Sequence, residues 1–325
     1  MSSSANYYKH YTKVAITQSH VFNQYIRSPL NLKFTIAIAR GPIIVSNMSE
    51  AIIKQYLFAS DFDQTLSFND SGLVLTELLG IPVEEFQEKA AGMAQLNLVQ
   101  QGAELAYLLL HDPAFSSRVR REHLIETGKR IPLKENIELL YRTLREGIPG
   151  YEFDFYVLSA APVEIVQSAL DGIVPAGHIY GTEFQYSASG AIERLIRCTA
   201  GYGKVTRIAQ LQAEHSIGPD HVVYAGDGSS DMNAMLHVNE GDGLTIAVSE
   251  SRCVTQIARR TVLSDNALSV LVPILEEVAH WTQPQIRRFF EAQGFLVQEW
   301  ARMRTDVLTL RSTSAATTSG ATEAQ

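Results

Sequence analysis

Four short apolar segments, each followed at once by polar residues, constrain the fold of this chain more than any other feature of its sequence. They are residues 55–60 (QYLFAS), 153–160 (FDFYVLSA), 221–226 (HVVYAG) and 244–248 (LTIAV). Short runs of this kind, rich in β-branched and aromatic residues and bounded by turn-forming residues, are typical of buried strands. Because segments with helical spacing separate several of them, the sequence predicts an α/β fold with a parallel sheet covered by helices on both faces.

Residues 72–149 interrupt this alternation, because they carry helical patterns and no strand pattern. Leu75, Leu78 and Leu79 recur at helical spacing, and residues 135–146 are rich in helix-forming side chains. We interpret residues 72–149 as an inserted helical cap domain. The α/β core then consists of residues 48–71 and 150–278.

The two ends of the chain differ from this core in composition. Residues 1–47 contain no Asp or Glu and carry a net charge of +5, within a chain whose formal net charge is −8. A basic, acid-free segment of this kind occurs in organelle transit peptides. We favour the alternative that it is a disordered or non-native extension. Residues 312–325 hold no large apolar side chain, which predicts a disordered tail.

An apolar stripe at three-and-four spacing predicts a C-terminal helical extension over residues 279–311. The stripe includes Ile286, Phe289, Leu296 and Trp300, and it has a gap at residues 293–294. Packing of this helix against its own domain is the favoured interpretation. A homodimer through the same stripe is the alternative.

Composition excludes several other classes of protein. The chain is 46% hydrophobic and 19% charged, which is the composition of a globular protein that can bury a core. Its negative charge argues against a nucleic-acid partner, and no apolar run approaches the roughly 18 residues of a membrane span. Only two cysteines occur, Cys198 and Cys253, which fits a reducing compartment and predicts a cytoplasmic location.

Polar residues with chemical potential follow the predicted strands or open the predicted helices. Asp61 and Asp63 follow the first strand, Ser159 lies at the end of the second, and Lys204 lies at the start of a helix. Asp227 and Asp231 follow the strand at 221–226. Carboxyl ends of parallel strands share one edge of the sheet, where ligands bind. Carboxylates gathered there repel one another unless a hard cation such as Mg²⁺ lies among them.

Three competing motifs fail on their spacing. A phosphate-binding loop at GYGKVT would need a glycine at Cys198 and a hydroxyl residue at Val205. A calcium loop starting at Asp61 would need a glycine at Leu66. The scattered cysteines and histidines match no zinc pattern.

Four motifs, in this order, carry a resemblance to a known superfamily. FASDFDQTLS, VLSAAP, GYGKV and YAGDGSSD resemble the four motifs of the haloacid dehalogenase-like (HAD) hydrolases, over roughly residues 53–278. The resemblance implies a Rossmann-like core with a cap of the first cap class. GTEFQYSASGAI and the Ser-Ala-Ala-Pro turn are similar to the phosphoserine-phosphatase-like branch. Dehalogenases of the superfamily lack an aspartate at the position of Asp63, so the resemblance implies a phosphatase.

The resemblance also implies a role for each motif residue. Asp61 would be the nucleophile that forms an aspartyl-phosphate, and Asp63 would be the general acid and base. Ser159 and Lys204 would stabilise the phosphoryl oxygens. The ligands of Mg²⁺ would be Asp61, the backbone carbonyl of Asp63, Asp227 and Asp231.

Substrate residues are less well marked. Thr65 is a candidate for a phosphate hydrogen bond, and Asp70 lies where phosphoserine phosphatases carry a glutamate that recognises the substrate amine. Arg118 is a candidate for gripping a substrate carboxylate, with Arg120 and Arg121 as alternatives. The expected partner is a small phosphorylated metabolite, such as phosphoserine, phosphocholine, phosphoethanolamine, a phosphoglycerol or a sugar phosphate. A phosphomutase and a catalytically inactive, phosphometabolite-binding relative are the alternatives.

Overall fold

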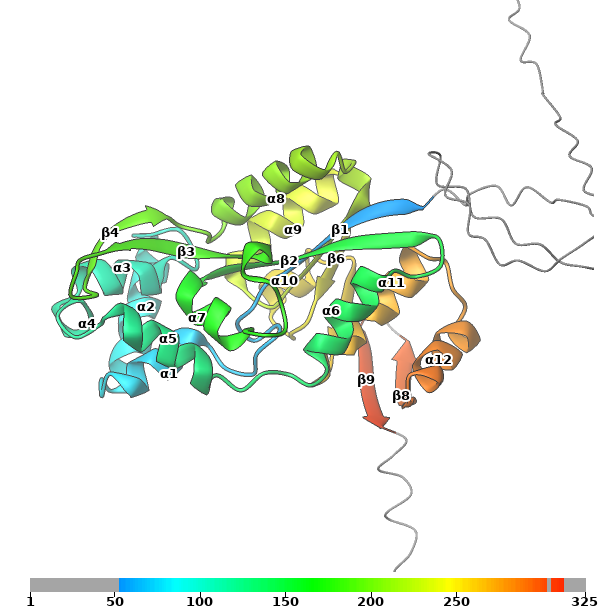
Figure 1. Cartoon of the computed structure of the whole chain (residues 1–325), viewed down its shortest axis with the longest axis horizontal. Helices are drawn as coiled ribbons and strands as arrows, with labels where there is room; N and C mark the ends of the chain where they lie inside the picture. Colours follow the sequence, from blue (N-terminus) through cyan, green and yellow to red (C-terminus); the bar gives the residue numbers. More distant parts are fainter. Residues whose placement is uncertain (1–52, 303–304, 313–325) are drawn as a thin grey trace, which may run out of the picture. The chain divides into compact units, whose positions relative to one another are not determined.

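A nine-stranded sheet forms the centre of the computed structural model, which describes residues 53–302 and 305–312 (Figure 1). The order of its strands is β4-β3-β2-β1-β5-β6-β7-β9-β8, and all neighbours are parallel except the pairs β3–β4 and β8–β9. The strands are β1 (Lys54–Ser60), β2 (Tyr151–Pro162), β3 (Ile179–Tyr186), β4 (Ile192–Arg197), β5 (Val222–Gly226), β6 (Leu244–Ala247), β7 (Arg260–Leu263), β8 (Phe295–Arg302) and β9 (Thr305–Ser312). The predicted α/β fold is confirmed. The prediction for residues 1–47 lies outside the described residues, as does the predicted tail 312–325 except for Ser312, which ends β9.

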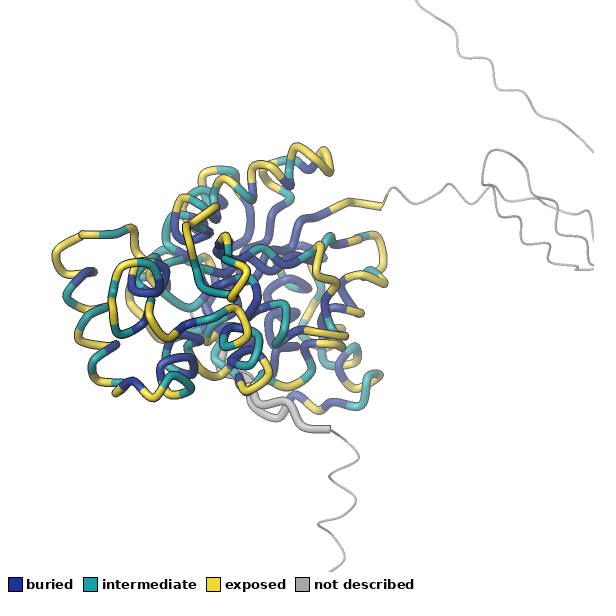
Figure 2. Tube along the Cα trace, turned by 60° about the vertical axis from the view of Figure 1, so that its left-hand side comes forward, coloured by how far each residue is buried: buried dark blue, intermediate teal, exposed yellow. Residues whose placement is uncertain are grey.

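Helices cover both faces of the central parallel strands. The core helices are α6 (Ile137–Glu146), α7 (Val163–Ala169), α8 (Tyr202–His215), α9 (Met232–Glu240), α10 (Arg252–Thr255), α11 (Leu271–Glu277) and α12 (Gln283–Ala292). Leu57 and Ala59 of β1 pack in one apolar cluster with Ile208 of α8 and Met235 of α9. Phe58, between them, belongs to the cluster on the opposite face. The alternation along β1 therefore places apolar side chains in two cores, and Figure 2 shows the buried residues running through the middle of the molecule.

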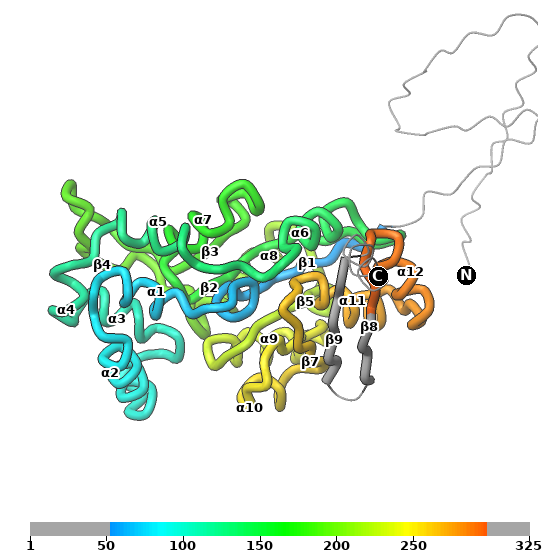
Figure 3. Tube along the Cα trace, turned by 90° about the horizontal axis from the view of Figure 1, so that it is seen from below, coloured from blue at the N-terminus to red at the C-terminus, as the bar shows by residue number. Residues whose placement is uncertain are grey.

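Five helices at one end of the sheet form the cap (Figure 3). They are α1 (Ser71–Leu78), α2 (Val83–Leu96), α3 (Glu104–His111), α4 (Pro113–Ser116) and α5 (Arg121–Arg130). The β3–β4 hairpin extends to this end, where β4 contacts α3 and the Arg121 N–H donates to the Gly190 carbonyl over 2.8 Å. The cap thus combines inserted helices with a hairpin from the core.

The predicted cap boundary at residue 149 is wrong, because α6 packs on the core sheet. Its Leu140, Tyr141 and Leu144 are buried, and the Tyr141 ring meets Phe155 of β2 edge-on at 5.4 Å. The apolar face of α6 therefore has a partner in β2, and the helical cap ends with α5.

The predicted C-terminal helix over 279–311 is correct only for its first part. The helix α12 ends before Gly294, which has a left-handed φ of +84°. The chain then forms the antiparallel hairpin β8–β9, and β9 adds to the sheet beside β7. Phe295 and Val297 are buried while Leu296 between them is partly exposed, so the spacing that suggested a helix is a strand alternation here. The stripe is not a continuous helix face, so it gives no basis for a helical dimer seam.

Two sequence expectations about the environment can be compared with the structure. Both Cys198 and Cys253 are free. Within the described part of the chain, the helices are all too short or too polar to cross a membrane.

Candidate active site

The loop after β1 places two aspartates at the edge of the sheet. The Asp61 N–H donates to the Ala225 carbonyl of β5 over 2.9 Å, and its side chain is buried. The Phe62 carbonyl accepts from the N–H groups of Leu66 and Ser67, which closes the loop tightly. Gln64, inside this turn, has a left-handed φ of +54°. Backbone conformations of this kind cluster at functional sites.

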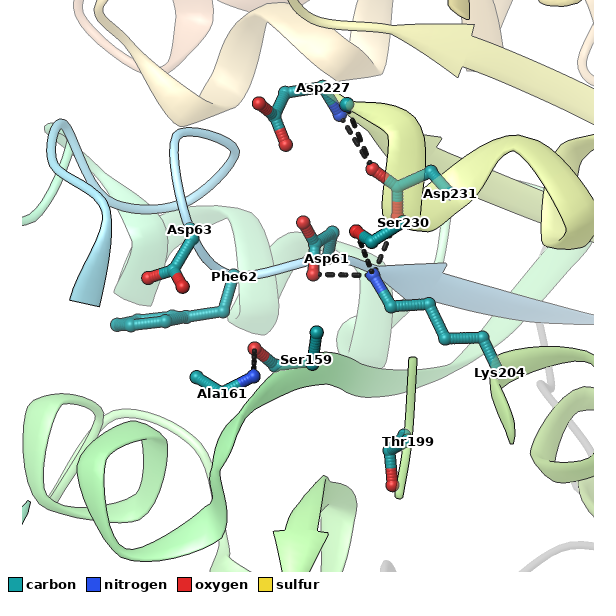
Figure 4. A network of polar contacts seen from close by, with 12 residues as sticks. Asp61, Phe62, Asp63, Ser159, Ala161, Thr199, Lys204, Asp227, Ser230 and Asp231 are labelled. Carbon is teal, nitrogen blue, oxygen red and sulfur yellow. Dashed lines mark hydrogen bonds and ion pairs between the residues drawn. The ribbon is translucent and has the colours of Figure 1, made fainter. Parts of the chain in front are cut away.

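Lys204 joins Asp61 to a second buried carboxylate (Figure 4). Its Nζ lies 2.7 Å from Asp61 Oδ1 and 2.6 Å from Asp231 Oδ1, and its side chain is fully buried. Burial alone lowers the pKa of Lys204, but attraction to Asp231 and Asp61 outweighs it, so the pKa is raised and the lysine stays charged. A buried charge of this kind is stable only with such partners.

Asp231 is held by protein groups on both of its oxygens. Besides Lys204, the hydroxyl group of Tyr224 donates to Oδ1, and the N–H groups of Asp227 and Gly228 donate to Oδ2 over 3.0 Å each. A Cβ at Gly226 would lie 2.4 Å from Asp231 Cγ, so only glycine fits there. In this arrangement Asp231 positions Lys204 and the loop that carries Asp227.

Three carboxylates come close enough to share a cation. One oxygen each from Asp61, Asp227 and Asp231 lies within 4.8 Å of the others. Burial raises the pKa of Asp61, and Asp231 raises it further; burial and then Asp61 and Asp231 raise the pKa of Asp227. The raised pKa values show that these crowded carboxylates repel one another. A hard divalent cation bound between their oxygens would relieve this repulsion.

Ser159 and Asp63 face the same space from two other elements. Ser159 Oγ accepts from the Ala161 N–H over 3.1 Å, which leaves its hydroxyl hydrogen for a ligand. The Asp63 carboxylate accepts from the N–H and the hydroxyl group of Ser71 at 3.1 and 2.7 Å. Burial and the nearby Asp70 raise the pKa of Asp63 well above the usual range, although the Ser71 hydroxyl opposes this.

A cavity of about 330 Å³ connects these groups to the cap. We call its core side the catalytic floor, which consists of Asp61, Asp63, Ser159 and Asp227, with Lys204 and Asp231 bonded directly to it. We call its cap side the cap wall, which consists of Asp70, Phe86, Ala90, Ala91, Ala94, Glu104 and Leu105. The cap meets the core at Gly102, whose φ is +86° and where a Cβ would lie 2.6 Å from Ser230 Cβ. The arrangement can hold a small anion on the floor and its substituent against the wall.

Comparison with protein-family models now identifies this fold and site. The haloacid dehalogenase-like hydrolase family matches residues 58–236, which is more than half of the chain. The chain belongs to the haloacid dehalogenase-like hydrolase family. The four motifs of the catalytic floor all lie within the matched residues.

Solved structures agree with this family assignment. A phosphoserine phosphohydrolase-like protein from Francisella tularensis subsp. tularensis SCHU S4 is 21% identical, with a TM-score of 0.52 over 67% of this chain and 99% of that chain. A phospho-aspartyl intermediate analogue of phosphoserine phosphatase is 18% identical, with a TM-score of 0.53 over 69% and 99%. A probable phosphoserine phosphatase from Vibrio cholerae, in unliganded form, is 15% identical, with a TM-score of 0.52 over 72% and 70%. At these identities the likeness shows a common HAD fold. The search of curated proteins found no match.

The predicted HAD motif residues come together, whereas two predicted substrate residues do not. Thr65 is buried outside the cavity lining, and its backbone N–H donates to the Phe62 carbonyl. Arg118 is exposed and donates to the Leu79 carbonyl over 3.4 Å, so it does not line the cavity either. Asp70 does line it, and its Oδ1 also caps α1 by accepting from the N–H groups of Gly72 and Leu73.

Several residues of this HAD site carry no distinguishing signal in the sequence. Tyr224 is an ordinary apolar position of β5 by pattern, yet its hydroxyl group binds Asp231. Ser71 is the first residue of α1, a position where serine is common, yet its hydroxyl group donates a hydrogen bond to Asp63. Glu104, the first residue of α3, was indistinguishable from any helix-starting glutamate. Only Tyr224 could have been suspected, since it lies two residues before the GDG turn.

Proposed function

We propose that this protein is a Mg²⁺-dependent phosphomonoester hydrolase that acts through an aspartyl-phosphate on a small phosphorylated metabolite. The observation that carries the proposal is the buried Lys204–Asp61 contact beside Asp227, in a cavity that Ser159 also lines. A positive charge held at 2.7 Å from a carboxylate suits a nucleophile that must approach a phosphate anion. The family assignment and the phosphatase names of the structural neighbours support the same reaction.

Asp61 is the nucleophile in this proposal. Lys204 holds Oδ1, which fixes the carboxylate and leaves its second oxygen to attack phosphorus in line. The new phosphorus–oxygen bond forms as the bond to the leaving group breaks. A water molecule then attacks the aspartyl-phosphate and restores the free carboxylate.

Asp63 is the proton donor and acceptor. Burial, and then Asp70, raise the pKa of Asp63, which favours the protonated form that a general acid needs. Asp63 gives this proton to the leaving oxygen in the first step and removes one from water in the second. The two hydrogen bonds from Ser71 keep the carboxylate beside the reacting centre between these steps.

Ser159 and Lys204 stabilise the charge on the transferred group. The Ser159 hydroxyl is free to donate, and the Lys204 ammonium group is fully charged, so both favour an anion on the floor. Asp61, Asp227 and the Asp63 carbonyl would hold Mg²⁺, with Asp231 as a further candidate. When bound, the ion would supply positive charge to the phosphoryl oxygens.

The test is hydrolysis of 4-nitrophenyl phosphate by the full chain, with Mg²⁺ or with excess EDTA. We expect release of phosphate with Mg²⁺, loss of activity with EDTA and recovery when Mg²⁺ is restored. Asp171→Asn, at an exposed position outside the cavity, is the control and should behave as the wild type. Full activity in EDTA would refute the metal requirement, and absence of any phosphate release would refute the phosphatase.

A further inference from the structure

The cap wall adds negative charge to a cavity that is already acidic. Asp70 and Glu104 line it beside Asp61, Asp63 and Asp227, and no lysine, arginine or histidine is among the described residues that form its lining. The nearest cation in the network, Lys204, is already paired with Asp61 and Asp231 beneath the floor. The substituent of a bound phosphate would therefore meet carboxylates and no positive side chain.

Asp70 and Glu104 come from different helices and face the same space. Asp70 precedes α1, where its Oδ1 accepts two backbone N–H groups, and Glu104 opens α3. Burial raises the pKa of Glu104, the backbone N–H groups of Glu104 and Gly102 lower it, and the negative charge of Asp70 raises it, so the two carboxylates that line this cavity repel each other. Within the described part of the chain, neither has an ion-pair partner among the side chains. A ligand cation between them would relieve this repulsion.

The rest of the wall suits an alkylammonium group. Phe86 offers an aromatic ring, whose face attracts cations, and Leu105 and the alanines add small apolar surfaces. The cavity volume of about 330 Å³ suits a small metabolite. Apolar surface combined with carboxylates matches an alkyl chain that ends in a positive nitrogen.

A substrate carboxylate has no partner on this wall. Arg118 donates to a backbone carbonyl outside the cavity, and Arg121 Nε lies 3.6 Å from Glu164. The carboxylate of an amino-acid phosphate such as phosphoserine would lie against Asp70 or Glu104 without a positive side chain to pair with. Its binding would cost desolvation with no compensating charge.

We propose that the leaving alcohol of the substrate is cationic, and that Glu104, together with Asp70 and Phe86, selects it. The substrate class is then phosphate monoesters of amino alcohols or quaternary ammonium alcohols, without a carboxylate. This inference rests on the proposed phosphatase function. Both carboxylates also interact with backbone N–H groups, but Asp70 in addition raises the pKa of Asp63, so we assign the preference to Glu104.

The first test compares kcat/KM of the full chain with Mg²⁺ for four alkyl phosphates of similar size. They are 2-aminoethyl phosphate, choline phosphate, neutral propyl phosphate and phosphoserine, with 4-nitrophenyl phosphate as the reference for phosphatase activity. We expect one or both cationic esters to exceed propyl phosphate by at least about tenfold, and phosphoserine to be poorer than 2-aminoethyl phosphate. The two cationic esters show whether a primary or a quaternary ammonium group is preferred.

The second test replaces Glu104 by glutamine, which keeps its shape and removes its charge. The ratio of kcat/KM for the preferred cationic ester to that for propyl phosphate should fall about tenfold in Glu104→Gln. It should stay at the wild-type value in Glu88→Gln, which removes an exposed charge from α2 outside the cavity.

The outcomes separate this inference from the proposed function. Hydrolysis of 4-nitrophenyl phosphate with propyl phosphate or phosphoserine preferred over both cationic esters would overturn the inference alone. An unchanged ratio in Glu104→Gln would remove Glu104 from the role that we give it. Failure to hydrolyse any ester, including 4-nitrophenyl phosphate, would overturn the proposed function and the inference with it.

Discussion

The catalytic floor and the cap wall enclose one cavity but are built in opposite ways. On the floor, Lys204 and Asp231 are fully buried, and the Lys204 ammonium group and both oxygens of Asp231 have protein partners. On the wall, Glu104 and Asp70 are partly exposed and have no side-chain counterion within the described residues. The buried Lys204–Asp231 pair of the floor is therefore complete without a ligand, whereas the two carboxylates of the wall have no charged protein partner in the part of the chain that the structure describes and are open to a ligand cation. Substitutions on the floor should affect all substrates and the stability of the fold, and substitutions on the wall should affect only the choice of substrate.

The largest effect should come from the two aspartates that follow β1. Asp61→Asn removes the nucleophile, so turnover should be abolished and no phosphoryl adduct should form. Asp63→Asn loses proton transfer, which contributes roughly 10²–10⁴-fold to the rate. With 4-nitrophenyl phosphate, whose leaving group needs little protonation, Asp63→Asn should still be phosphorylated and the adduct should persist. Intact-protein mass spectrometry measures this, and an adduct on Asp61→Asn but not on Asp63→Asn would reverse the roles.

Removal of the buried lysine should be the next largest effect and should appear in stability. Lys204→Met leaves Asp61 and Asp231 buried without their counterion, and we expect a loss of about 3–5 kcal/mol in the free energy of unfolding. Lys129→Met, at an exposed position of α5, is the control from the cap and should stay within about 0.5 kcal/mol of the wild type. Urea denaturation in EDTA measures both. Equal stability of the two variants would break the contrast between floor and cap.

The pH dependence of the free energy of unfolding should differ between the metal-free and the Mg²⁺-bound catalytic floor, and this effect should be of intermediate size. Burial, and then the charges of Asp61 and Asp231, raise the pKa of Asp227 to about 9. A carboxyl group with a higher pKa in the folded protein binds more protons when folded, so its stabilising contribution is full below about pH 4 and is lost as pH rises through the folded pKa.

In EDTA, the free energy of unfolding of the wild type should therefore fall relative to that of Asp227→Asn as pH rises from about 4 towards 9. Added Mg²⁺ should reduce this fall for the wild type. Urea denaturation at a series of pH values measures the difference between the two proteins. A difference that is constant with pH would mean that Asp227 titrates as an ordinary exposed carboxyl group.

The smallest effect should come from Tyr224→Phe, which removes one hydrogen bond from the floor. Asp231 keeps its bonds to Lys204 and to two backbone N–H groups, so the loss in unfolding free energy should be about 0.5–1.5 kcal/mol. Turnover should fall by a similar factor for cationic and neutral esters, because the floor acts on the phosphoryl group. Tyr202→Phe, at an exposed position of α8, is the matched control. A change in substrate preference in Tyr224→Phe would contradict the assignment of this tyrosine to the catalytic floor.

The same contrast explains which parts of the molecule the sequence could predict. Asp61, Ser159 and Asp227 are predictable because each lies at or just after the carboxyl end of a predicted buried strand, and parallel strands bring these ends to one edge. The residues of the wall come from helix starts and turns, whose arrangement depends on how the cap helices pack. This is why Arg118 was placed near the substrate, although it donates to Leu79, and why Glu104 was missed.

The errors in the predicted secondary structure have a similar origin. The strand β7 is only four residues long and begins with Arg260, a charged side chain that pairs with Glu276 and Glu277, so it lacks the apolar run that marks the other parallel strands. In the C-terminal segment, a helical spacing and a strand alternation overlap over residues 295–302, and pairing with the neighbouring strands decides between them. Short apolar runs are ambiguous until their tertiary partners are known.

The close approach of Gly102 to Ser230 has a consequence for how substrate range can change in such a chain. Gly102 has a left-handed φ, and a Cβ added there would lie 2.6 Å from Ser230 Cβ. The cap therefore contacts the core at a position that accepts only glycine. Glu104 lies only two residues further along, and its side chain lines the cavity. Substitutions in the cap wall can therefore change the substrate preference one residue at a time, while the contact between Gly102 and Ser230 keeps the wall in the same position relative to the catalytic residues.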